Sequence, residues 1–78
     1  MSTDKRYKPS WLDADVPEWA NYLAQDRDGL WFWYSDKPVK DIANSFWLAF
    51  IGQTHGAGFS KPNENWKNTL EQRPEEKR

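Results

Sequence analysis

The chain has 78 residues, which is enough for a single small domain. Its formal net charge of -1 excludes a strong general attraction for nucleic acid, because such attraction depends on an excess of lysine and arginine. The absence of cysteine excludes disulfides and thiolate metal sites, and no apolar run approaches the roughly 20 residues that span a bilayer. The basic N-terminal residues precede no apolar stretch, so we predict a soluble intracellular protein without a signal peptide.

Both ends of the sequence are polar and frame the part that can fold. We expect disordered tails at residues 1–9 and 75–78, and one small aromatic-rich domain over residues 10–74. Six tryptophans in so short a chain carry a large apolar surface. Either nearly all of them lie in the core or some are covered by a second copy of the chain, which leaves a homodimer open.

The most informative pattern is a run of five large apolar side chains at residues 30–34, directly after the turn sequence of residues 26–29. Aspartate at the first position of that turn and glycine at its last are typical of a tight reversal. We therefore predict a β-hairpin in which residues 21–25 pair with residues 30–34. A helix over residues 16–25 is the alternative, because the apolar residues there also fit helical spacing.

The second half of the domain has weaker signals. Residues 46–51 are a continuous apolar run of strand length, which predicts a strand buried on both faces or nearly so. Three glycines within residues 52–58 predict a flexible loop, and the spacing of Trp66 and Leu70 predicts one face of a short helix or turn. The predicted fold class is mostly β (small α+β), with a three- to four-stranded antiparallel sheet and one short C-terminal helical segment.

Two motifs give the chain a family resemblance. Residues 26–34 read D-x-D-G-x-W-x-W-[YF], and residues 65–74 read N-W-x-x-[ST]-L-x-x-R-P. Over residues 10–74 the chain resembles small accessory proteins of tailed bacteriophages and prophages that carry these two motifs. The resemblance assigns no chemistry to the motifs. It implies a viral protein in the cytoplasm of the infected bacterial host, where such products commonly bind a host protein or a component of anti-phage defence.

No residue pattern predicts catalysis, a cofactor or a metal. His55 is the only histidine and has no companion at metal-ligand spacing, so we interpret it as a solvated residue of the glycine-rich loop. Those glycines lack the Lys-Ser/Thr sequence of a phosphate loop. Asp26 and Asp28 are explained by the turn they form, because a calcium loop needs further ligands at set positions. We predict that the protein is not an enzyme.

The aromatic run supplies the first candidate partner-binding residues, Trp31, Trp33 and Tyr34. Three interpretations stay open: the aromatic side chains form the core, they anchor a protein interface, or they stack on a nucleotide. Successive strand residues point to opposite faces, so in a one-layer sheet one row lacks a core to enter. We expect Trp31 and Trp33 to be that outward row.

A second candidate surface is acidic. Asp13, Asp15 and Glu18 cluster with no positive charge among them, as expected for a solvated edge or for carboxylates that mimic phosphates. The predicted function is a non-catalytic phage accessory protein, an inhibitor that binds and blocks a host or anti-phage defence protein. The alternatives are an aromatic platform for a nucleotide or single-stranded nucleic acid, and a minor structural component of the virion.

Overall fold

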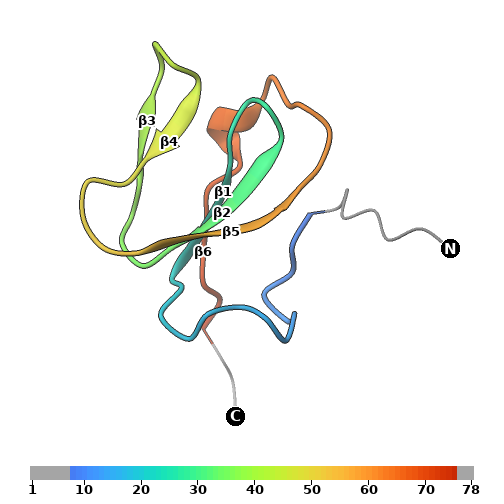
Figure 1. Ribbon diagram of the computed structural model, residues 1–78, viewed down its shortest axis with the longest axis vertical. Helices are drawn as coiled ribbons and strands as arrows, with labels where there is room; N and C mark the ends of the chain where they lie inside the picture. The colour runs from blue at the N-terminus through green and yellow to red at the C-terminus, as the bar shows by residue number, and fades with distance from the viewer. Residues whose placement is uncertain (1–7, 76–78) are drawn as a thin grey trace, which may run out of the picture.

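A computed structural model describes residues 8–75 of the chain, and Figure 1 shows how its strands are arranged. The elements in chain order are β1 (Tyr22–Gln25), β2 (Leu30–Tyr34), β3 (Val39–Asp41), β4 (Phe46–Leu48), β5 (Thr54–Phe59), the 3-10 turn η1 (Trp66–Asn68) and β6 (Glu71–Gln72). Four strands form an antiparallel sheet in the order β5-β2-β1-β6, while β3 and β4 form a separate antiparallel hairpin. The predicted fold class, mostly β with one short helical segment near the C-terminus, is confirmed.

The central hairpin of β1 and β2 forms across the predicted turn. Leu23 lies opposite Trp33, and the backbone N–H of Gly29 donates to the carbonyl of Asp26 over 2.9 Å. The Asp28 carboxylate accepts from the N–H of Leu30 over 3.1 Å, which is the local role that the turn sequence predicts. The helical alternative for residues 16–25 is excluded, because β1 pairs with β2 on one side and with β6 on the other.

Gly29 provides a direct test of this hairpin. Its φ is 101°, and a Cβ at this position would lie only 2.3 Å from the carbonyl oxygen of Ser60. We expect Gly29→Val to lower the free energy of unfolding by roughly 2–4 kcal/mol, since left-handed strain and a backbone clash both oppose it. Asp28→Asn keeps the side-chain acceptor and should shift the thermal midpoint far less. Equal, small shifts for the two variants would contradict the assigned turn.

One face of the sheet is covered by the N-terminal segment, residues 8–20. Trp31, Trp33 and Leu23 point to this face and pack beneath Trp11 and Trp19. The ring centroids of Trp11 and Trp33 are 4.8 Å apart in an edge-to-face contact. The expectation that Trp31 and Trp33 form an outward row is therefore wrong, because residues with no regular secondary structure close this face.

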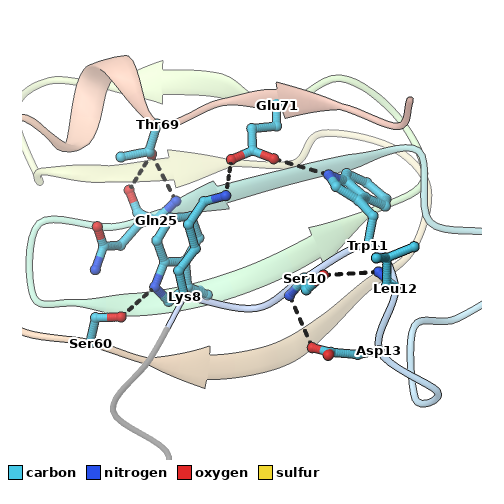
Figure 2. A network of polar contacts seen from close by, with 10 residues as sticks. Lys8, Ser10, Trp11, Leu12, Asp13, Gln25, Ser60, Thr69 and Glu71 are labelled. Carbon is cyan, nitrogen blue, oxygen red and sulfur yellow. Dashed lines mark hydrogen bonds and ion pairs between the residues drawn. The ribbon is translucent and has the colours of Figure 1, made fainter. Parts of the chain in front are cut away.

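The N-terminal segment begins earlier than the predicted domain boundary. Pro9 is fully buried, and the Lys8 ammonium lies 2.6 Å from a carboxylate oxygen of Glu71. Figure 2 shows Glu71 between Lys8 and Trp11, whose indole N–H donates to its other carboxylate oxygen over 3.0 Å. Two residues assigned to the predicted N-terminal tail thus belong to the packed part of the chain. The rest of that tail, and residues 76–78 of the C-terminal one, lie outside the described residues.

The opposite face of the sheet is covered by the β3–β4 hairpin and η1. Ala24 and Tyr34 point to this face and pack against Trp47 and Trp66. The rings of Trp47 and Trp66 meet edge to face at 6.0 Å, and Leu70 packs against the same cluster. Strand β2 is therefore covered on both faces, although Phe32 is half-buried and Leu30 is exposed, and the sheet is the middle of three layers.

Two other predictions are corrected. The apolar run of residues 46–51 is a strand only as far as Leu48, and Phe50 and Ile51 are 76% and 67% exposed. The glycine-rich residues predicted to be a loop form β5, which pairs with the outer edge of β2. Glycine suits this position because the ladder is irregular there, and Gly58 has a φ of 138°.

Candidate functional site

The structure places the three aromatic candidates inside the protein. Trp31, Trp33 and Tyr34 are 5%, 2% and 3% exposed. The indole N–H of Trp31 donates to the hydroxyl of Ser60 over 2.9 Å, so its polar atom has an internal partner. These side chains build the core of the folded chain, and they offer no ring face to a partner in this conformation.

The three acidic candidates all belong to the N-terminal segment. Asp15 and Glu18 are exposed, whereas Asp13 is half-buried and accepts from the backbone N–H of Ser10 over 3.0 Å (Figure 2). Arg73 holds the end of the segment, since its guanidinium donates to the carbonyl of Ala20 over 2.7 Å. The acidic residues thus belong to a segment that is anchored near both ends, and two of them are exposed to solvent.

A concave site that the sequence did not indicate lies on the other face, beside the β3–β4 hairpin. Trp47 positions this hairpin by three hydrogen bonds. Its backbone N–H donates to a carboxylate oxygen of Asp26 over 2.8 Å. Its indole N–H donates to the carbonyls of Gln25 and Trp66, over 3.0 and 3.3 Å. The hairpin is therefore attached both to the sheet and to η1, and its position relative to each is fixed.

Gln25 is the buried polar residue at the centre of this attachment. Its backbone N–H donates to the hydroxyl of Thr69 over 2.9 Å, and Figure 2 shows the two residues side by side. Its side-chain oxygen accepts from Asn63, and its side-chain nitrogen donates to the carbonyl of Gly29. The side-chain amide thus fixes the loop of residues 61–63 against the turn, while the backbone groups of Gln25 bond Thr69 and Trp47.

The result is a groove of about 400 Å³ between β3 and η1, which we name the lysine groove. Its lining consists of Lys37, Pro38, Val39, Lys40, Trp47, Lys67, Asn68 and Leu70. Pro38 and Trp47 are buried and Leu70 is half-buried, so the deeper surface is apolar. The three lysines are exposed and come from two elements and the loop before β3.

The lysines of the groove form no ion pair with another side chain of residues 8–75. Within residues 8–75 the ion pairs are Lys8 with Glu71 and Arg27 with Glu64, and neither involves a lysine of the groove. The adjoining carboxylates have local roles, because Asp36 accepts from Ser35 and Asp41 accepts from Asn44. The groove therefore combines an apolar floor with a positive rim, a chemistry that fits an anionic group attached to an apolar body.

His55, which the sequence suggests is a solvated residue, lies outside this groove. His55 is exposed on β5 opposite Trp33, and residues 8–75 hold no cluster of three His, Asp or Glu side chains close enough to share a metal ion. Sequence reasoning missed the lysine groove because Lys67 is far from Lys37 and Lys40 along the chain. The only available signal was the pair of lysines that flank Pro38-Val39, and it does not identify a site alone.

Asp26 beneath the β3–β4 hairpin makes the free energy of unfolding depend on pH. Burial raises the pKa of its carboxyl above the ordinary value, the hydrogen bond from the backbone of Trp47 opposes this, and the charge of Asp28 reinforces it. A raised pKa in the folded state means that the protonated form is favoured on folding. The stability that this group contributes is full below its unfolded pKa and is lost as the pH rises through its folded pKa.

Asp26→Asn should remove this pH dependence. The amide oxygen can still accept from the backbone of Trp47, and no charge is buried. We expect the variant to be at least as stable as the wild type at neutral pH, with the difference shrinking as the pH falls toward the ordinary pKa of aspartate. Thermal denaturation of both proteins across this range measures it. A large loss of stability at neutral pH for Asp26→Asn would contradict the assigned effect of burial.

Comparisons with known proteins do not add a homologous site. None of the helical structure in residues 8–75 is long and apolar enough to cross a membrane. No protein-family model, curated protein or solved structure matches the chain.

Proposed function

We propose that the protein is a non-catalytic accessory protein of a tailed phage or prophage that binds and blocks a host or anti-phage defence protein in the cytoplasm of the infected bacterium. The lysine groove carries the binding part of this proposal. It is a concave apolar surface rimmed by three exposed lysines on a chain whose net charge is -1. The phage origin rests on the resemblance of residues 26–34 and 65–74.

The partner that fits the groove is an acidic segment of a protein that also carries aliphatic side chains. Long-range attraction by Lys37, Lys40 and Lys67 speeds encounter with a negative surface. The floor formed by Pro38 and Leu70 then contributes by removing apolar surface from water. When the groove binds such a segment, the partner's natural ligand can no longer reach it, and the partner is inhibited by occlusion.

A protein segment fits better than a nucleotide or single-stranded nucleic acid. Stacking on a base requires an exposed aromatic face. Trp47 is the aromatic residue of the groove, yet it is 6% exposed and its indole N–H is bonded within the core. The groove therefore offers charge and aliphatic contact, and little surface for stacking.

Charge reversal in the groove tests the proposal. We expect tagged wild-type protein to retain a specific protein from a bacterial lysate, identified by mass spectrometry. Affinity for that purified protein, measured by calorimetry, should fall at least about tenfold, or about 1.4 kcal/mol, in the double variant Lys40→Glu/Lys67→Glu. The control is Lys61→Glu, which reverses one charge at an exposed residue outside the groove and is compared with the single variants Lys40→Glu and Lys67→Glu.

The proposal also predicts a salt dependence, and two outcomes of the binding experiment would contradict it. The interaction should also weaken as salt rises, because exposed charges are screened. A partner that binds Lys40→Glu/Lys67→Glu as tightly as the wild type would exclude the lysine groove. Loss of binding on replacing Asp15 and Glu18, with the groove variants unaffected, would instead assign the interface to the acidic segment.

A further inference from the structure

Strand β5 gives the sheet an open edge. It is the longest of the strands in the described residues and pairs with β2 on one side only. Its sequence from Thr54 to Phe59 contains no charged residue and no proline, which are the usual means by which proteins prevent pairing at an edge. The opposite edge strand, β6, has only two residues. The sheet can therefore be extended through β5.

The hydrogen-bond pattern identifies the groups that are available at this edge. The backbone N–H of Ser35 donates to the carbonyl of Gln53 over 3.0 Å, so these two opposed residues are a hydrogen-bonded pair. Every second pair along the β2–β5 ladder is then hydrogen-bonded as well. In an antiparallel ladder, alternate residues direct both backbone groups to the same side. The backbone N–H and C=O of His55 thus point toward β2, whereas those of Thr54 and Gly56 point away from the sheet.

We propose that a second copy of the chain pairs with this edge, strand β5 against strand β5 in antiparallel orientation, about a two-fold axis that passes beside His55. Thr54 of each copy then lies opposite Gly56 of the other, and their outward N–H and C=O groups form the new ladder. The two four-stranded sheets become one continuous sheet. The bulge between Gly56 and Gly58 limits close pairing to the first half of β5.

Exposed apolar side chains at the two ends of β5 favour a second copy as the occupant. Phe59 and its cross-strand neighbour Leu30 are exposed at one end, while Phe50 and Ile51 are exposed just before the other. Antiparallel pairing about His55 brings the Phe59 end of each copy to the Ile51 end of the other. The same contact is made twice, which is the self-complementarity that a two-fold interface requires.

This inference goes beyond the proposed function and does not depend on it. The residues that line the lysine groove belong to β3, β4, η1 and their loops, and none of them is in β5. A dimer paired at β5 would therefore present two grooves. A partner with two acidic segments could occupy both grooves at once and would bind more tightly than to a single groove. An experiment can therefore disprove the dimer without disproving partner binding, and the reverse.

Sedimentation equilibrium on the wild-type chain is the first measurement. We expect a species near twice the monomer mass of 9.3 kDa at high micromolar concentration, dissociating on dilution. In the dimer, the amide protons of Thr54 and Gly56 should exchange with solvent more slowly than in the diluted monomer. A chain that stays monomeric at high concentration would overturn the proposal.

Two matched pairs of variants locate the interface. His55→Lys places two like charges beside each other at the axis and should abolish the dimer, whereas His55→Gln should retain it. Ile51→Asp should also give a monomer, whereas Leu12→Asp, at a residue that is 94% exposed in the N-terminal segment, should not. All three positions are exposed, so circular dichroism should show unchanged folding for the four variants. A wild-type dimer that persists in both His55→Lys and Ile51→Asp would overturn the assignment to β5.

Discussion

Trp33→Ala should lower the free energy of unfolding by about 3–5 kcal/mol, enough to unfold a large part of a domain this small at ordinary temperature. Trp33 is 2% exposed and lies between Leu23 and the ring of Trp11. Truncation removes a large apolar contact and leaves a cavity under the N-terminal segment, which has no strand pairing to hold it closed. Urea denaturation followed by far-ultraviolet circular dichroism measures the loss.

The control for Trp33→Ala is Leu12→Ala, because Leu12 lies in the same segment and is 94% exposed. It should change the free energy of unfolding by no more than about 0.5 kcal/mol. If Trp33→Ala left the unfolding midpoint unchanged and removed only binding, the side chain would have to be outside the core. That outcome would restore the outward-facing aromatic row that the sequence predicted.

Trp47→Ala should be similarly destabilising, by about 3–5 kcal/mol, since this side chain fixes the β3–β4 hairpin. Trp47→Phe separates the two contributions of the indole. It keeps most of the ring contact with Trp66 and loses the N–H that donates to Gln25 and Trp66, so we expect a cost of about 1–2 kcal/mol. The two variants are compared by urea denaturation.

The Trp47→Phe variant also connects stability with binding. If the hydrogen bonds of Trp47 hold the lysine groove in place, binding of the captured partner should weaken in this variant although every lysine is retained. Equal costs for Trp47→Ala and Trp47→Phe would show instead that hydrogen bonding, and not packing, dominates at this site.

The local parts of the fold were predictable because their causes are local. The turn at residues 26–29 places aspartate and glycine where the backbone needs them, and the hairpin follows from this turn and the aromatic run. Trp66 and Leu70 pack in one layer, as their spacing predicted. The burial of Trp31 and Trp33 was not predictable in this way, because the cover over them is an irregular segment with neither periodicity nor regular pairing.

The pairing of β5 could not be read from its sequence. Strand propensity is poor in a segment with two glycines between Thr54 and Phe59, and the cause of pairing is the exposed edge of β2, which is a tertiary feature. Asp26 was explained as a turn residue, and its bond to the backbone of Trp47 was missed for the same reason. The candidate site was missed entirely, because the lysine groove joins residues from distant parts of the chain.

The contacts between the two ends of the described residues have a consequence for folding during synthesis. Glu71 forms an ion pair with Lys8 and accepts a hydrogen bond from Trp11, and Arg73 donates to the carbonyl of Ala20. The cover over the tryptophan face is therefore secured by β6, the last strand of the described residues, and by the residue that follows it. A chain still on the ribosome without residues 71–73 can form the central hairpin, yet it lacks the contacts that hold its N-terminal segment down. Trp31 and Trp33 are then open to chaperones or to aggregation, and folding is completed late, as expected where distant contacts dominate.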